Sequence, residues 1–347
     1  MGHLLRTVTL TLLVAMFVGC GGSNNSSNSS TNTGGNTGGS SSGGSNAGGS
    51  NTGGGSNTGG GTGGTGGGTG SSASVQHVVV VILENQDYGA VVGNTAVMPF
   101  FNNLITQGAL ATQFYANTHP SLGNYMFLTA GTNPTGDEDN WAGTWSGDNI
   151  VRQLTAAGKT WKVYAESLPS VGYTGGDTAD QYIKHHNPFV YFTDVLNSPT
   201  QLNNVVPFTQ FTSDVGANTL PSYSFVVPNN SHNGHDCPTG GSTCPLSDHL
   251  TAIDSWLSNN VGPLMQNSTV MSNTVVVVTF DESLTDNTNG GGRIATVFAG
   301  PLVKSGYQST TTYKMESLLR FSLESLGVTT FPNGAASTPG MGEFLKQ

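Results

Sequence analysis

The chain has 347 residues, with 50 glycines but only 10 Lys and Arg and 20 Asp and Glu, so its composition does not describe one uniform globular domain. Residues 21–70 contain 22 of the glycines, and no charged residue lies between Arg6 and Glu84. The part beyond that gap has 9 Lys and Arg against 20 Asp and Glu. Because nucleic acid requires a basic face, this acidic balance excludes nucleic acid as an expected partner.

An apolar run at residues 8–18 follows Arg6 and ends just before Cys20. The run is too short to span a bilayer and is typical of a bacterial export signal. Since a cysteine directly follows it, residues 1–20 resemble a lipoprotein signal peptide, with Cys20 as the acylated first residue. An ordinary cleaved signal peptide is the alternative. We therefore expect an exported lipoprotein of the bacterial cell envelope, anchored to a membrane and either periplasmic or surface-exposed.

Residues 21–72 consist of Gly, Ser, Asn and Thr with one alanine, Ala47. Such a segment has no apolar surface to offset the entropy of ordering, so it predicts a flexible tether. Residues 73–347 are numerous enough to bury a substantial core. We interpret them as one catalytic domain, because no second linker interrupts them.

Strands and helices are predicted to alternate along this domain. Apolar, largely β-branched runs at residues 77–83, 160–165, 223–227, 274–279 and 294–299 predict buried strands. Helical periodicity predicts helices at residues 98–107, 122–130, 149–157, 250–257 and 314–326. The alternation indicates an α/β fold, a three-layer sandwich with a mostly parallel central sheet.

Oxygen-bearing side chains follow two of the predicted strands. Glu84 and Asn85 come directly after the first strand, and Asp281 and Glu282 follow the strand at 274–279. In sheets of this kind ligands gather at the carboxyl ends of the strands. The two pairs could therefore meet at one edge of the sheet.

Ser121 stands at the start of a predicted helix, where free backbone N–H groups and the helix dipole favour a phosphate. On local sequence alone a helix N-cap is the preferred interpretation, because serine is among the preferred N-cap residues. His119 adjoins Pro120 and is expected to shape the preceding turn, with an active-site role as the less favoured alternative.

Cys237 and Cys244 are close in sequence. Outside the cytoplasm, such a pair predicts a disulfide that closes a small loop. A metal-binding pair is the less favoured alternative, because no further cysteine is left to complete a thiolate site.

Several short motifs, taken together and in order, resemble those of the bacterial phosphoesterase family of acid phosphatases and phospholipases C. The motifs are Glu84-Asn85, Thr118-His-Pro-Ser-Leu-Gly-Asn-Tyr125, Thr129-Ala-Gly131, Lys184-His-His-Asn-Pro-Phe189, Asn233-Gly-His-Asp236, Asp254-Ser-Trp-Leu257 and Thr279-Phe-Asp-Glu282. They cover nearly the whole domain, although no single one is specific. The resemblance implies an alkaline-phosphatase-like fold.

The resemblance also implies roles for individual residues. Ser121 corresponds to the nucleophile, Asn124 to a phosphate-contacting residue, and His186 and His235 to active-site histidines, with His185 as a further candidate contact. The implied metal ligands are Glu84, Asn85, Asp281 and Glu282. One motif departs from the family pattern, because Met315 stands where many relatives have a histidine.

The implied chemistry fits the composition. A phosphate ester is anionic, so its hydrolysis requires charge neutralisation, an activated nucleophile and a protonated leaving group. A divalent cation on the four ligands would provide the first two, which explains how an acidic protein could act on an acidic substrate. Oxygen ligands favour Ca²⁺, Mg²⁺ or Mn²⁺, whereas an added histidine would favour Zn²⁺, and the identity stays open.

We therefore expect metal-dependent hydrolysis of phosphate monoesters through a serine nucleophile. A phospholipase C-type diesterase using the same site is the nearest alternative, ranked second because no amphipathic membrane-binding stretch follows the tether. A catalytically inactive binding lipoprotein of the cell surface is a third hypothesis, favoured by Met315 and by the length of the tether.

Overall fold

The computed structural model describes residues 74–240 and 243–347, and the strands of this part form one eight-stranded sheet. The predicted signal peptide, the lipidation residue Cys20 and the predicted tether lie outside the described residues. The strand order is β4-β3-β5-β1-β6-β7-β2-β8. The strands are β1 (His77–Leu83), β2 (Ala109–Tyr115), β3 (Trp161–Ala165), β4 (Val205–Pro207), β5 (Tyr223–Val227), β6 (Thr274–Phe280), β7 (Arg293–Ala299) and β8 (Tyr307–Tyr313).

The sheet is mostly parallel, as the sequence predicted. Only β7 runs antiparallel to its two neighbours, β6 and β2. The other pairings of the described strands are parallel. All five predicted strands are present, and the structure adds β2, β4 and β8.

The three added strands lack the continuous apolar pattern of the others. Strand β4 has three residues and lies at one edge of the sheet, and β8 lies at the other edge with only Ser309 and Tyr313 buried. Strand β2 shifts register against both neighbours, where Thr112 and Gln113 interrupt its apolar residues. Strand β8 gives a weak sequence signal because most of its side chains face solvent, β4 because it is short, and β2 because polar residues interrupt its apolar run.

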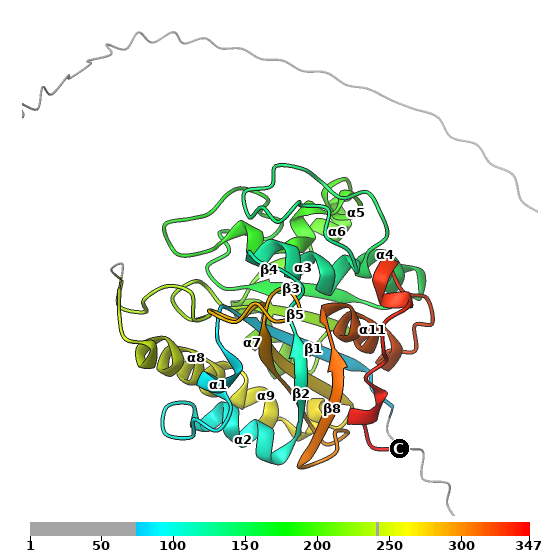
Figure 1. Ribbon diagram of the computed structural model, residues 1–347. Helices are drawn as coiled ribbons and strands as arrows, with labels where there is room; N and C mark the ends of the chain where they lie inside the picture. The colour runs from blue at the N-terminus through cyan, green and yellow to red at the C-terminus, as the bar shows by residue number, and fades with distance from the viewer. Residues whose placement is uncertain (1–73, 241–242) are drawn as a thin grey trace, which may run out of the picture. The chain divides into compact units, whose positions relative to one another are not determined.

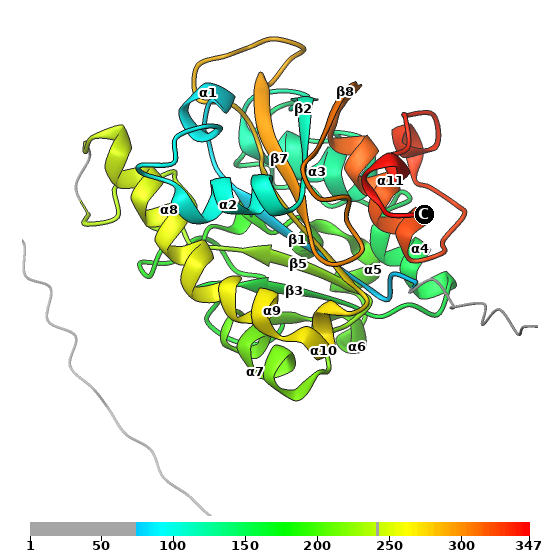
Figure 2. The ribbon, with the colours of Figure 1, turned by 90° about the horizontal axis from the view of Figure 1, so that it is seen from below.

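Helices cover both faces of the sheet, which confirms the three-layer sandwich (Figures 1 and 2). One layer contains α2, α7, α8, α9 and α10, and the other contains α3, α4 and α11. None of the described helices is long and apolar enough to cross a membrane. The α-helices are α1 (Tyr88–Val91), α2 (Pro99–Gln107), α3 (Ser121–Ala130), α4 (Ile150–Ala156), α5 (Thr193–Leu196), α6 (Pro199–Leu202), α7 (Thr209–Ala217), α8 (Leu246–Asn260), α9 (Gly262–Gln266), α10 (Ser268–Met271) and α11 (Met315–Ser325).

Short 3₁₀ helices occupy several of the connections. They are η1 (Lys184–His186), η2 (Pro188–Tyr191), η3 (Asn333–Ala336) and η4 (Gly342–Phe344). The first two belong to the long connection between β3 and β4, which lies near α3. This connection therefore brings the Lys184–Phe189 motif towards the helix that begins with Ser121.

The pairing of β1 with β6 forms the centre of the sheet. Both strands are rich in valine and almost completely buried, because helices cover both faces. They run in parallel and in register, with Leu83 opposite Phe280. The next residues, Glu84 and Asp281, therefore leave the sheet at the same level, and the Asp281 N–H donates a 2.9 Å hydrogen bond to the carbonyl of Leu83.

Helix α8 fixes the start of α2 through the buried carboxylate of Asp254. Its Oδ1 accepts a 2.8 Å hydrogen bond from the backbone N–H of Phe101, and its Oδ2 accepts a 3.0 Å bond from that of Phe100. These N–H groups belong to the first turn of α2, which has no side-chain cap of its own. Asp254 thus acts as a structural anchor between α8 and α2.

Replacing this carboxylate should destabilise the fold. We expect Asp254→Ala to lower the free energy of unfolding by about 2 kcal/mol, because two backbone donors lose a charged acceptor. Ser255→Ala, at an exposed position of the same helix, is the control and should change stability by less than about 0.5 kcal/mol. Urea denaturation followed by circular dichroism measures both, and equal destabilisation of the two variants would contradict the capping role.

Candidate active site

The residues after β1 and β6 form one buried group, as their positions in the sequence suggested. Glu84, Asp281 and Glu282 are all buried. Asn85 adopts a left-handed backbone conformation with a φ of 51°, which asparagine tolerates better than most residues. In this conformation its N–H donates a 3.0 Å hydrogen bond to Asp281 Oδ1, which ties the two strand ends together.

Ser121 is the first residue of α3 and faces this group. Its hydroxyl donates a 3.0 Å hydrogen bond to Glu84 Oε2. The N-cap position belongs to Pro120, and no side chain caps the helix. The N-cap interpretation of Ser121 is therefore wrong, because its hydroxyl binds a carboxylate of another element instead of a backbone N–H of its own helix.

Among the described residues, histidines are the only basic side chains that pair with the buried carboxylates. Lys and Arg form none of the ion pairs that involve Glu84, Asp281 or Glu282. Burial, with the charge of Asp281 added, raises the pKa of Glu84 well above its usual range. The same two causes raise the pKa of Glu282 to about 10, and burial also raises the pKa of Asp281. A bound cation would remove this electrostatic penalty.

The donor types present suit such a cation, and Glu84, Asp281 and Glu282 are not among the described side chains whose donor atoms all lie within 4.8 Å of one another. Asp281 Oδ2 is buried and has no hydrogen-bond partner in the described structure. It lies in a group whose side chains offer carboxylate and amide oxygens, the donors that hard divalent cations prefer. An unpartnered buried oxygen of this kind is costly unless a cation or water satisfies it.

Asn124 fixes the turn before α3. Its oxygen accepts hydrogen bonds from the N–H groups of Asn117 (2.8 Å) and Thr118 (3.1 Å). Its amide donates to the carbonyl of Thr118 (2.8 Å) and to Glu282 Oε2 (3.1 Å). All four hydrogen-bonding positions are thus engaged within the protein, so contact with a phosphate would require Asn124 to release one of these partners.

His119 joins the site through Glu282. Its Nδ1 lies 3.2 Å from Glu282 Oε2, and its peptide bond to Pro120 is cis. The sequence had favoured a role in the turn alone. Met315 begins α11, and its N–H donates a 3.3 Å hydrogen bond to Asn117 Oδ1.

His186 and Tyr125 lie on the other side of Glu84. The Tyr125 hydroxyl donates a short hydrogen bond to Glu84 Oε1, and the Tyr125 ring stacks on the His186 ring with centroids 5.4 Å apart. His186 Nε2 lies 3.2 Å from the same Oε1 but is not aligned for a hydrogen bond. Burial lowers the pKa of His186, because a buried ring disfavours the charged form.

The loop after β5 brings a further set of polar residues to Glu84. The carbonyl of Asn233 accepts a 2.9 Å hydrogen bond from the Glu84 N–H, and the Asn233 amide lies 3.4 Å from His186 Nδ1. His235 is more exposed than His186, and its Nδ1 lies 2.7 Å from Asp236 Oδ1. The structure thus brings His186 and His235 to the same region, with ring centroids 6.3 Å apart.

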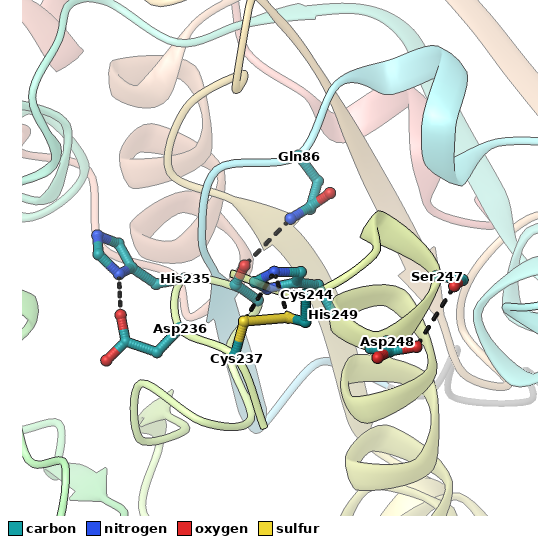
Figure 3. The surroundings of a disulfide bond; sticks show 9 residues. Gln86, His235, Asp236, Cys237, Cys244, Ser247, Asp248 and His249 are labelled. Atoms are coloured by element: carbon teal, nitrogen blue, oxygen red, sulfur yellow. Dashed lines mark hydrogen bonds and ion pairs between the residues drawn. A yellow bond between two sulfur atoms is a disulfide. The ribbon is translucent and has the colours of Figure 1, made fainter. Parts of the chain in front are cut away.

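A disulfide between Cys237 and Cys244 connects the end of this loop to the start of α8 (Figure 3). His249 Nε2 lies 3.1 Å from Cys244 Sγ and 4.0 Å from Cys237 Sγ. In the described residues, these are the only three His, Cys, Asp or Glu side chains whose donor atoms all lie within 4.8 Å. Because both sulfurs are in the disulfide, the group acts as a covalent link next to His235 and Asp236.

Asp139 and His185 form the outer wall of the site. Asp139 Oδ1 accepts a 2.8 Å hydrogen bond from the N–H of Leu122, the residue after Ser121. Asp139 Oδ2 lies 3.9 Å from His185 Nε2. His185 thus lies beside the site, and burial lowers its pKa.

The sequence analysis missed two of these residues, Tyr125 and Asp139. Tyr125 is four positions after Ser121, so helical spacing alone places both on the same face of α3. Asp139 belongs to an irregular connection with no periodic pattern. Its place at the start of α3 depends on tertiary folding.

The chain is similar to known phosphoesterases. The family model for phosphoesterases matches residues 94–328. A phosphatidylinositol-3-phosphatase from Mycobacterium tuberculosis is 36% identical over 68% of this chain and 72% of that protein. An acid phosphatase from Aspergillus fumigatus is 30% identical over 71% of this chain, and a probable acid phosphatase from Kluyveromyces lactis is 31% identical over 61%. The chain spans about half the length of these two fungal relatives, 55% and 49% respectively.

Solved structures show the same fold. A protein of the alkaline phosphatase superfamily from Vibrio parahaemolyticus has a TM-score of 0.55 at 14% identity, covering 78% of this chain and 72% of that one. The lipoteichoic acid synthase from Listeria monocytogenes has a TM-score of 0.54 at 14% identity, covering 77% and 76%. At this identity the likeness concerns the fold alone, which is alkaline-phosphatase-like.

The chain belongs to the phosphoesterase family, and with its phosphatase relatives it is classed as a hydrolase of phosphoric esters. The family resemblance read from the sequence motifs is thereby confirmed. Glu84 and Asn85 lie outside the matched residues 94–328, and the pairing of β1 with β6 brings them to Ser121 and Asp281.

Removing the Tyr125 hydroxyl should weaken catalysis by releasing Glu84. We expect Tyr125→Phe to lower kcat for p-nitrophenyl phosphate about tenfold or more, the usual effect of losing a hydrogen bond that orients an active-site carboxylate. Tyr223→Phe is the matched control, because the Tyr223 hydroxyl is equally buried but has no hydrogen-bond partner in the described structure.

Thermal unfolding of the two variants shows whether a loss of activity comes from a misplaced Glu84 or from a destabilised fold. Both variants should unfold near the wild-type temperature, while only Tyr125→Phe loses activity. If the two variants had the same kcat, the hydroxyl of Tyr125 would have no positioning role.

Proposed function

We propose that this protein hydrolyses phosphate monoesters in a metal-dependent reaction with Ser121 as the nucleophile. The observation that carries the proposal is the 3.0 Å hydrogen bond from Ser121 Oγ to Glu84, within buried carboxylates that pair with no Lys or Arg of the described chain. The names of the relatives, acid phosphatase and phosphatidylinositol-3-phosphatase, support a monoester as substrate, because both describe removal of a phosphate group.

Ser121 would attack the phosphorus atom. It lies at the N-terminus of the ten-residue helix α3, where the partial positive charge of the helix favours an anionic phosphoryl group. Glu84, which accepts its hydrogen bond, holds Oγ in place. Formation of the Oγ–P bond and cleavage of the ester P–O bond would leave phosphoserine, which water then hydrolyses to free phosphate.

The cation would be held by Glu84, Asn85, Asp281 and Glu282. Glu282 Oε2 is engaged by Asn124 and His119, so its other oxygen and Asp281 Oδ2 are the atoms left for binding. When bound, a divalent cation would neutralise the phosphoryl oxygens and lower the pKa of the Ser121 hydroxyl. The oxygen donors suit Ca²⁺, Mg²⁺ or Mn²⁺.

The proton for the leaving alcohol would come from His235. Its side chain is 43% exposed, and Asp236 binds its Nδ1, so Nε2 remains available to the substrate. His186 is 1% exposed and packed against Tyr125 and His185. We therefore assign His186 to positioning Glu84, and the exposed ring of His235 to proton transfer.

Ser121→Ala tests the nucleophile. We expect it to reduce kcat for p-nitrophenyl phosphate by at least about a thousandfold, because no other hydroxyl replaces the attacking group. In wild type, quenching with acid during turnover and mass spectrometry should find phosphate on Ser121. Ser170→Ala, at an exposed position outside the site, is the control for the substitution itself.

Three outcomes would overturn the proposal. Full activity of Ser121→Ala would exclude this serine as the nucleophile. Faster hydrolysis of p-nitrophenyl phosphorylcholine than of p-nitrophenyl phosphate would favour a phospholipase C-type diesterase. Negligible rates for both esters in wild type would favour a binding lipoprotein that lacks catalysis.

We also propose that the protein is exported and anchored to a membrane of the cell envelope through Cys20. The support is the sequence of residues 1–20 alone. Cells given labelled fatty acid should incorporate it into wild type but not into Cys20→Ser, and the variant should leave the membrane fraction. Equal labelling of both would exclude Cys20 as the acylated residue.

A further inference from the structure

A cavity of about 410 Å³ lies beside the catalytic group and has no role in the reaction described above. Its wall includes Asp139, Trp141, Asp177, Lys184 and Tyr191. We propose that this cavity binds the leaving group of the ester and that it accepts a neutral polyhydroxy alcohol, such as a sugar or a cyclitol. The inference rests on the proposed phosphomonoesterase function, since it names the substrate class of the same site.

Asp139 connects the cavity to the nucleophile. Its Oδ1 accepts the hydrogen bond from Leu122 N, directly after Ser121, and its side chain also lines the cavity. His185 belongs to the cavity wall as well, and its ring contacts that of His186, which lies against Glu84. The alcohol part of an ester bound at Ser121 is therefore next to the cavity.

The volume sets the size of the leaving group. A cavity of 410 Å³ equals the liquid volume of about 13 water molecules at roughly 30 Å³ each. It therefore holds an alcohol of about that many non-hydrogen atoms, which corresponds to one sugar or cyclitol ring. Acyl chains of a lipid would have to remain outside.

The charges of the wall select a neutral group. The Lys184 ammonium lies 5.1 Å from the centroid of the Tyr191 ring. Lys184 therefore already makes the cation–π contact that a cationic leaving group could make with this ring. Asp139 and Asp177 would repel a second anionic group. Because carboxylates accept hydrogen bonds from hydroxyl groups, the wall favours an alcohol with several hydroxyls and no charge of its own.

Asp177 has an oxygen available for such a bond. Its Oδ1 accepts a 2.8 Å hydrogen bond from the backbone N–H of Lys184, and Oδ2 accepts none within the described chain. The Trp141 Nε1–H likewise has no partner among the described residues and is a free donor. The cavity thus offers both an acceptor and a donor to hydroxyl groups.

The aromatic side of the cavity is held rigid. The Trp141 ring stacks on Tyr191 with centroids 5.7 Å apart. A Cβ on Gly143 would approach the Trp141 ring to 2.4 Å, so only glycine allows this close packing. Aromatic rings beside polar groups are found in sites for small ligands, and the Trp141 ring complements the C–H groups of a sugar ring.

Substrate preference tests the proposal. Wild type should hydrolyse glucose 1-phosphate and myo-inositol 1-phosphate with a higher kcat/KM than methyl phosphate. Asp177→Asn should reduce this ratio about tenfold, because a hydroxyl loses a charged acceptor. Asp180→Asn, an exposed carboxylate of the same loop that does not line the cavity, should leave the ratio unchanged.

A binding measurement separates this proposal from the catalytic one. Calorimetry with the Ser121→Ala protein should find tighter binding of glucose 1-phosphate than of methyl phosphate, and Asp177→Asn or Trp141→Ala in that background should remove the difference. If wild type hydrolysed no ester, the phosphomonoesterase function would fail, while this difference in affinity would still decide the role of the cavity. Equal affinities for glucose 1-phosphate and methyl phosphate would overturn the assignment of the cavity to the leaving group.

Esters with charged leaving groups test whether the cavity prefers a neutral alcohol. Preference for phosphocholine or for a hexose bisphosphate over glucose 1-phosphate would overturn the assignment to a neutral alcohol. Phosphatidylcholine vesicles that contain a neutral glycolipid phosphorylated on its sugar identify the source of the polyol. Hydrolysis of this lipid at a rate similar to the soluble ester indicates a lipid headgroup, and hydrolysis of the soluble ester alone indicates a free polyol phosphate.

Discussion

The burial of carboxylates at the ends of two neighbouring parallel strands is the constraint on which the site depends. Strands β1 and β6 pair in register, so Glu84 and Asp281 are brought together when the sheet forms. Burying ionised carboxylates without a partner costs several kcal/mol per ion. The surrounding residues reduce this cost only in part, because their hydrogen bonds reach some of the oxygens and leave Asp281 Oδ2 without one in the described structure. The proposed function therefore includes a cation that would complete the site.

The rest of the fold positions other groups around these carboxylates. Helix α3 presents Ser121 and Tyr125 to opposite oxygens of Glu84, since the two residues are one helical turn apart. The loop after β5 supplies Asn233 and His235, and the disulfide at its end joins it to α8. The connection between β3 and β4 supplies His186 on one side and the wall of the cavity on the other. One sheet edge thus receives the groups that we propose for catalysis and specificity from several separate connections.

The sequence predicted the centre of this arrangement better than its periphery. The valine-rich strands β1 and β6 gave clear signals because both of their faces are buried, and the rule that ligands gather at strand ends then predicted the meeting of Glu84 with Asp281. The edge strand β8 gave no such signal, since most of its side chains are exposed. The role of Ser121 needed the family motifs, because its local sequence favoured a cap. The sequence could not predict the position of Asp139 or the presence of the cavity. Both depend on irregular connections, and such connections have no periodic pattern of residues.

Metal content and activity, measured on the same protein, test the requirement for a cation most directly. Purified protein is analysed by elemental mass spectrometry, then treated with chelator and assayed with p-nitrophenyl phosphate before and after divalent cations are restored. We expect wild type to contain at least one divalent ion per chain. Chelation should abolish its activity, and one of the restored ions should recover it. Asp281→Asn should bind less metal and stay inactive. Full activity in protein shown to be free of metal would contradict the account.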